Sequence, residues 1–275
     1  MREDDDKFIT GLTAQTSYSG YLCLDELLAA QRPRSSHHDE MLFIIQHQVS
    51  ELWMKLMIHE LEAAIVHVRA DRLEPCFKIL ARVKQVQRQL FEQWSVLETL
   101  TPSEYVEFRD VLGPASGLQS YQFRAVEFLL GNKNARFMEV HRHDAPVYER
   151  LAKLLASPSL YDEFLRYLAR RGMPIPLERV ERDWSQPYEG HRGVTAVFRT
   201  IYQNTQQFWA EYDMCEKLVD VEENFQLWRF RHVKTGERII GFKPGTGGTS
   251  GVAFLRRTLE TSLFPELVDV RTEIH

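Results

Sequence analysis

The chain has 275 residues, 44% hydrophobic and 27% charged, the balance of a soluble globular protein that can bury a large core. Its formal net charge is −5 and its lysines and arginines are dispersed, which argues against nucleic acid or an anionic membrane as a partner. No apolar run reaches the roughly 18 residues of a membrane span, and the acidic first residues are unlike a signal peptide. With three cysteines far apart, we expect a cytoplasmic protein with reduced thiols.

The first long helical pattern covers residues 40–68, after residues 1–15, a candidate for disorder. Its polar stripe is narrow, and a helix that is apolar on nearly all sides is typical of the centre of a bundle. We expect His47 to lie beside Phe43 on an interior face. The two apolar faces consist of Leu42, Ile45, Val49, Leu52 and Leu56, and of Phe43, His47, Met54, Ile58, Leu61 and Ile65.

Residues 101–114 carry signals for both the start and the end of a helix. Thr101 can be the N-cap, Pro102 the first helical residue and Glu104 the capping-box partner, while Gly113 precedes a proline that ends the helix. Tyr105 and Arg109 share one face of this helix. Burying an unpaired guanidinium is costly, so Arg109 needs a carboxylate, from another helix or from a ligand.

The remaining elements are also helical. Residues 116–131 and 157–172 are predicted helices, and the stretch 174–194, rich in proline, glycine and charge, is predicted to be a long connection. Helical patterns then run from about 194 to 217 and from about 221 to 240. Strand-like alternation and hairpin turns are absent, so we predict an all-α helical bundle that forms a single domain over residues 1–275.

The last of these patterns places a second histidine on an apolar face. The helix-interior Gly236 costs about 1 kcal/mol relative to Ala and is expected to loosen the helix just after His232. The face recurs at spacings of four, three, four and seven residues and consists of Val221, Phe225, Trp228, His232 and Ile239.

The ten histidines do not form a common metal motif. No Glu-x-x-His pair of a di-iron bundle occurs, and His59 begins an incomplete zincin motif. The His-x-His pair at His141 is more typical of a solvated surface. His47 and His232 remain, either as two core histidines or as a distal and proximal haem pair.

Residues 241–251, GFKPGTGGTSG, could suggest a phosphate-binding loop. A P-loop places its lysine after the glycines and follows a strand, whereas here Lys243 precedes them and a helix comes before. A flexible connection between helices explains the same composition.

Four long stretches together resemble the tryptophan 2,3-dioxygenase family. They are HHDEMLFIIQHQVSELWMKLMIHEL, EQWSVLETLTPSEYVEFRDVLGPASGLQSYQFR, QLWRFRH and GFKPGTGGTSG, and the resemblance runs in order from about residue 16 to 264. It implies an all-helical, cytosolic, homotetrameric oxidoreductase with one haem b per subunit. Such an enzyme inserts both atoms of O2 across the indole C2–C3 bond of L-tryptophan, giving N-formyl-L-kynurenine and opening catabolism through kynurenine.

The resemblance also assigns roles residue by residue. His232 matches the axial iron ligand, and His47 matches the distal histidine that hydrogen-bonds the indole N–H, where positioning is its expected part in catalysis. Phe43 matches the ring packed on the indole, and Tyr105 with Arg109 match the pair that holds the substrate carboxylate. The other matches are Thr246 at the amino-acid end of the substrate, Trp94, Ser116 and Gly117 around the haem, and Tyr18, Tyr21 and Leu22 in a segment that enters a neighbouring subunit's site.

Two other classes of protein remain open. A non-catalytic haem sensor or carrier could share the fold, although an O2 sensor would not need Arg109, Tyr105 and Thr246. A helical scaffold without a cofactor is the third hypothesis.

Overall fold

The computed structural model describes residues 9–13 and 15–274, and within them every regular element is a helix, so the predicted all-α fold is confirmed. Three short 3-10 helices, η1 (Asp110–Leu112), η2 (Gly117–Gln119) and η3 (Ala135–His141), join the α-helices. In chain order the α-helices are α1 (Tyr18–Tyr21), α2 (Leu24–Leu28), α3 (Glu40–Arg69), α4 (Glu74–Glu92), α5 (Trp94–Leu97), α6 (Pro102–Arg109), α7 (Tyr121–Leu130), α8 (Ala145–Leu155), α9 (Leu160–Arg170), α10 (Leu177–Val180), α11 (Arg192–Gln203), α12 (Trp209–Ile240), α13 (Val252–Thr258) and α14 (Pro265–Glu273).

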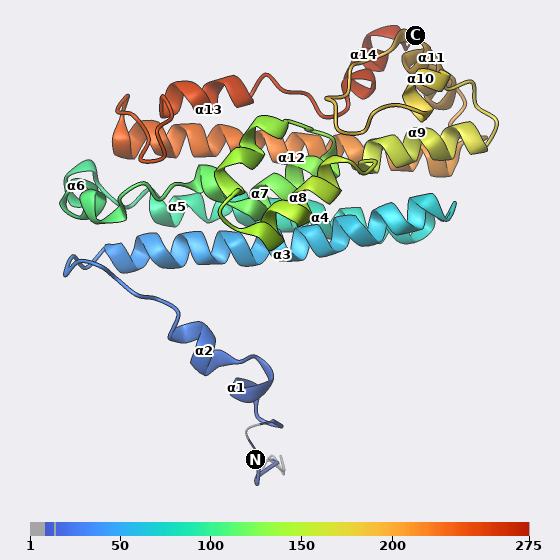
Figure 1. Ribbon diagram of the computed structural model, residues 1–275. Coiled ribbons are helices and arrows are strands. Elements are labelled where there is room, and N and C mark those ends of the chain that lie inside the picture. The colour runs from blue at the N-terminus through green and yellow to red at the C-terminus, as the bar shows by residue number, and fades with distance from the viewer. Residues whose placement is uncertain (1–8, 14, 275) are drawn as a thin grey trace, which may run out of the picture.

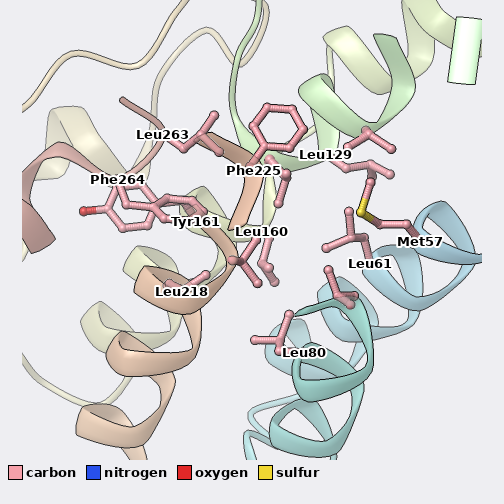
Figure 2. Close-up of a cluster of buried hydrophobic side chains, with 14 of the residues drawn as sticks. Met57, Leu61, Leu80, Leu129, Leu160, Tyr161, Leu218, Phe225, Leu263 and Phe264 are labelled. Carbon is pink, nitrogen blue, oxygen red and sulfur yellow. The ribbon is translucent and has the colours of Figure 1, made fainter. Parts of the chain in front are cut away.

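The framework consists of the three long helices α3, α4 and α12. Helix α4 packs against both α3 and α12, while α7 and α9 pack on α3 (Figure 1). Buried aliphatic and aromatic side chains from these helices gather between them (Figure 2). No helix among the described residues is both long and apolar enough to cross a bilayer.

Helix α3 buries the second of its two predicted apolar faces from Met54 to Ile65, while Phe43 and His47 at its start are half-buried. Ile58 and Leu61 of the second face are buried, as predicted. On the first face, however, Ile45 and Leu52 are 44% and 48% exposed, because the neighbours of α3 cover its other side. The N-terminal half of α3 therefore presents an apolar stripe to the surroundings.

The predicted boundary between the two last long helices is wrong. Helix α11 ends at Gln203, and α12 runs without interruption from Trp209 to Ile240, through the predicted gap at 217–221 and through Gly236. The chain breaks instead around Asn204, whose side-chain amide donates to the Thr200 carbonyl. This local bond competes with continuation of the helix.

The helix caps follow the sequence signals closely. Thr101 and Glu104 form the predicted capping box of α6. Helix α9 begins after Ser159, which forms a capping box with Asp162, and not at Ser157 as predicted. The connection over 174–194 contains the short helix α10.

The N-terminal helices α1 and α2 project away from the bundle (Figure 1). Residues 9–13 and 15–16 are exposed, and neither short helix contains a buried residue. The prediction of disorder for residues 1–15 falls partly on residues 1–8 and 14, which lie outside the described residues. Residues 9–13 and 15–28 therefore form an arm with little packing of their own against the bundle.

Candidate active site

At one end of the bundle, the start of α3, helix α6, the C-terminal half of α12 and the loop 241–251 lie close together (Figure 1). Four rings from α3 and α6 form an apolar wall there. The Phe43 ring lies 4.2 Å from the His47 ring, 5.9 Å from that of Tyr105 and 5.8 Å from that of Phe108, centroid to centroid. The spacing of four residues between Phe43 and His47 places both on one face of α3, as predicted.

The tautomer of His47 follows from its hydrogen bond. Its Nδ1 lies 2.7 Å from the carbonyl oxygen of Phe43, and a carbonyl can only accept, so Nδ1 carries the hydrogen. Burial lowers the pKa of His47, which favours the neutral ring. Neutral His47 then has an acceptor at Nε2, beside the aromatic wall, to which no group in residues 9–13 and 15–274 donates.

His232 lies on α12, and its ring stacks on that of Trp94 at 4.7 Å with 14° between the planes. Burial lowers the pKa of His232 to about 4. The ring is therefore neutral at physiological pH, the form that binds a metal. Among the described residues, no hydrogen-bond partner occupies either nitrogen of His232.

These residues fit a haem better than a metal ion held by side chains alone. In the described part of the chain, no group of three or more His, Cys, Asp and Glu side chains could hold an ion. A haem iron needs only one protein ligand, and His232 offers a neutral ring next to stacked aromatic surface. The indole Nε1 atoms of Trp94 and Trp228 are also buried without a partner among the described residues.

Arg109 reaches the glycine-rich loop, not another helix. Its Nη2 donates to the Pro244 carbonyl at 2.8 Å, and its buried Nε has no partner within the described residues. No ion pair of Arg109 occurs in residues 9–13 and 15–274. The interpretation of Arg109 as half of an interhelical salt bridge is therefore wrong, and a ligand carboxylate remains.

The loop 241–251 is docked on the segment before η2. The Thr246 hydroxyl donates to the Ala115 carbonyl at 2.6 Å. A Cβ added at Gly247 would lie 2.6 Å from Cβ of Ser116, so only glycine allows this approach. The loop thus brings Thr246, Ser116 and Arg109 to the same end of the bundle, although the four stretches that supply the site are far apart in sequence.

Other predicted residues have different outcomes. Tyr18, Tyr21 and Leu22 are 74%, 82% and 40% exposed, on the arm and away from the site of their own chain (Figure 1). In the His-x-His pair only His143 is exposed. His141 is buried with Nε2 unpaired within the described residues, so the prediction of a solvated surface is wrong for that residue.

Sequence reasoning did not identify His37 as part of this region. Its Nε2 lies 3.3 Å from a Glu107 carboxylate oxygen, and its ring lies 5.6 Å from that of Phe108. His37 therefore links the chain before α3 to α6, which carries Tyr105 and Arg109. The spacing along the sequence gave no signal of this contact, because 70 residues separate the partners.

The chain is similar to known proteins over nearly its whole length. The family model described as tryptophan 2,3-dioxygenase matches residues 6–200 and 191–274. A protein of that name from Serratia proteamaculans is 62% identical over 275 residues, covering 99% of this chain and 98% of its own. Namesakes from Myxococcus xanthus and Kineococcus radiotolerans are 62% and 58% identical over 99% of this chain and 94% and 96% of theirs. With matches that span nearly its whole length, this chain belongs to the tryptophan 2,3-dioxygenase family.

Proposed function

We propose that this protein is a haem-dependent oxidoreductase that inserts O2 across the indole C2–C3 bond of L-tryptophan and yields N-formyl-L-kynurenine. The reaction would open tryptophan catabolism through kynurenine. The observation that carries the proposal is the neutral His47 beside Phe43, with its Nε2 acceptor free for an indole N–H.

We further propose one haem b per subunit, with His232 as the sole protein ligand of its iron. When bound, the haem would supply the O2 chemistry. The burial of His232 keeps its ring deprotonated, and the stack on Trp94 holds the plane of that ring. Ser116 and Gly117 lie in the segment that the loop covers and would border the haem.

The indole would be held by apolar contact and one hydrogen bond. Phe43 offers a ring face, and His47 accepts the N–H through Nε2. An indole N–H is a very weak acid, so we propose that His47 acts by fixing the orientation of the indole ring. Holding reactants in the right orientation can by itself lower a reaction barrier substantially. A misplaced indole would present the wrong carbon atoms to O2.

The amino-acid end of tryptophan would be held from two sides. Arg109 has the planar pair of donors that suits a carboxylate, and Tyr105 lies one turn before it on α6. Thr246 would approach the ammonium and carboxylate from the loop. One donor of Arg109 holds the Pro244 carbonyl of the loop, while its Nε has no partner among the described residues, so one guanidinium can contact the loop and the substrate carboxylate together.

The residues proposed to hold the amino-acid end of tryptophan argue against the rival proposal of a non-catalytic haem sensor or carrier. A carrier of O2 needs a haem pocket but no carboxylate site. The gathering of Arg109, Thr246 and Tyr105 at the end that holds His47 favours an enzyme acting on an amino acid, in agreement with family membership.

We also propose a cytoplasmic homotetramer in which the arm completes a neighbouring site. The exposed rings of Tyr18 and Tyr21 support this assembly, because aromatic residues are enriched where interfaces are buried. The apolar stripe of α3 with Ile45 and Leu52 adds a second surface that would be covered by another copy.

The decisive assay adds L-tryptophan and air to the reduced haem protein and follows the absorbance of N-formylkynurenine. His232→Ala should lose stable haem binding or all activity, while His47→Ala should keep the haem and lose part of the rate. Absence of product from the wild-type protein would favour the carrier. A His232→Ala variant with an unchanged histidine-ligated spectrum and full turnover would refute the ligand assignment.

A further inference from the structure

A single glutamate holds the part of α12 that carries His232. The Glu98 carboxylate accepts two hydrogen bonds from Arg231, from Nε at 2.6 Å and from Nη2 at 2.5 Å, and a third from the Thr235 hydroxyl at 2.9 Å. The Glu98 carbonyl also accepts from Arg238 Nε at 3.0 Å. Three side chains spread over two turns of α12 thus converge on one residue, directly around His232.

The same glutamate is fixed to the ring that stacks on His232. Glu98 follows α5, and its backbone N–H donates to the Trp94 carbonyl at 2.8 Å. Glu98 therefore connects the two partners of the Trp94–His232 stack through bonds on both sides. The Arg231 guanidinium is held further by the Phe91 ring, 5.4 Å from its centroid.

This contact differs from an ordinary surface ion pair, which contributes little. The Glu98 and Arg231 side chains are only 20% and 29% exposed, and the bidentate geometry fixes direction as well as distance. Burial pushes the pKa of Glu98 upward, but the hydrogen bonds from Arg231 and Thr235 outweigh it and lower the pKa. The carboxylate is thus ionised when it binds α12.

The orientation of His232 must come from its surroundings. A metal-binding histidine is usually aimed by a hydrogen bond to its second ring nitrogen, but within the described residues His232 makes no such bond. Its ring direction therefore depends on the rotation of α12 about its own axis and on the Trp94 stack, the two features that Glu98 joins.

We propose that Glu98 is a positioning residue that locks α12 in rotation against α5 and thereby aims the His232 ring. Glu98 itself touches neither the substrate nor the cofactor. This inference rests on the proposed ligation of haem by His232. Arg231 and Thr235 are the residues through which Glu98 would hold α12.

The first test needs no haem. In apoprotein with 13C-labelled histidine, the His232 ring resonance should be shifted upfield by the stacked indole. Glu98→Ala should reduce that shift, Glu98→Gln should reduce it less, and Arg231→Lys, which loses the bidentate geometry, should resemble Glu98→Ala. The three variants together guard against one that fails to fold.

Glu237→Ala is the matched control. Glu237 lies on the same helix with a side chain 21% exposed and accepts two hydrogen bonds from Arg256, at 3.1 and 2.6 Å. Its removal should lower stability to a similar extent and leave the His232 resonance unchanged. An equal change in both variants, or none in Glu98→Ala, would overturn the positioning role.

The second test uses the haem-loaded protein. Glu98→Ala should broaden or shift the iron–histidine stretching band in the resonance Raman spectrum and raise the rate of haem loss about tenfold, as expected for a residue that orients a metal ligand. Glu237→Ala should do neither. If His232→Ala retained a histidine-ligated spectrum, the proposed ligand would be wrong. If His232→Ala lost that spectrum and Glu98→Ala matched the wild type, only the role of Glu98 would be wrong.

Discussion

Lys133 is a buried lysine whose ammonium group donates to the carbonyl oxygens of Leu154 and Ser157, at 2.7 and 2.8 Å. Burial lowers its pKa to about 8, below the value of about 10.4 for an unfolded chain. The unfolded state then holds the proton between these two values, so the stability from this group rises with pH over that window and is lost below pH 8.

We predict that wild type gains stability relative to Lys133→Met as pH rises from about 8 to 10, by up to roughly 1.4 kcal/mol per pH unit. Urea unfolding of both proteins at several pH values measures the difference. Lys153→Met, at an exposed position on α8, is the comparison variant for removal of a lysine charge. A constant difference between wild type and Lys133→Met across this range would show that the buried group does not titrate there.

Gly236 can be replaced by alanine without loss of packing. A Cβ at this position would lie 3.5 Å from Cγ2 of Val252 and 3.7 Å from Cδ1 of Leu255, which is ordinary contact. Since α12 continues through Gly236, Gly236→Ala should raise the free energy of unfolding by about 0.5–1 kcal/mol. Thermal unfolding checks it. Gly241→Ala, at φ +59°, should lower stability, and a destabilised Gly236→Ala would mean that the helix needs its glycine.

At the scale of elements, we propose that the loop 241–251 is a lid, and in the structure this loop is docked on the segment before η2. Thr246 and Arg109 make its contacts to the rest of the protein, and a small shift of the loop would free both for the substrate. Ordering of such a glycine-rich segment costs conformational entropy, which the zwitterion of tryptophan would offset and indole alone would not.

We predict that L-tryptophan, but not indole, protects residues 243–251 from hydrogen exchange. Thr246→Ala should weaken tryptophan binding by roughly 1.5–3 kcal/mol, the contribution of one hydrogen bond to a charged group, and should reduce discrimination between the L and D forms. Equal protection with both ligands, together with unchanged kinetics of Thr246→Ala, would reduce the loop to a plain connection.

The close approach of Gly247 to Ser116 offers a sharper test of the docked loop. Gly247→Ala should raise KM for tryptophan, because its Cβ would overlap Ser116. Gly247→Ala combined with Ser116→Gly removes the obstacle and should recover much of the loss relative to Ser116→Gly alone. Failure of this rescue would indicate that the loop need not reach Ser116.

The elements themselves were largely predictable from local signals, and the site was not. The capping box of α6 and the apolar face of α12 are encoded within a few residues, so both were predicted. The end of α11 was missed because the bond from Asn204 to Thr200 is one of several equally common local options. The contacts of Arg109 with Pro244 and of Glu98 with Arg231 join residues more than 130 positions apart, which no local pattern reports.

At the scale of the whole molecule, we retain the proposal of one domain. Helices on both sides of the 174–194 connection support it, since α12, which follows the connection, packs on α4, α5 and α6, which precede it. The resemblance located the candidate residues by position. The neutral state of His47 and His232 and the docking of the loop 241–251 follow only from the packing.

The arm gives the last prediction. Removal of residues 1–22 should weaken tryptophan binding and reduce the tetramer, because each site would lose the neighbouring rings of Tyr18 and Tyr21, which are exposed within their own chain. Light scattering and tryptophan titration measure the two effects. Leu177→Ser, at another exposed apolar position, should change neither. A fully active monomer would exclude the shared site.

Helix α3 carries His47 on one side and the exposed residues Ile45 and Leu52 on roughly the opposite side. If a second copy covers that stripe, helix α3 contacts the neighbouring subunit on one side and the bound indole on the other. Linkage is reciprocal. If assembly strengthens the binding of tryptophan, then bound tryptophan stabilises the assembly by the same free energy. Dilution of the protein should therefore lower its affinity for tryptophan, and saturating tryptophan should slow the exchange of subunits. The stability of the oligomer would then depend on the concentration of its substrate.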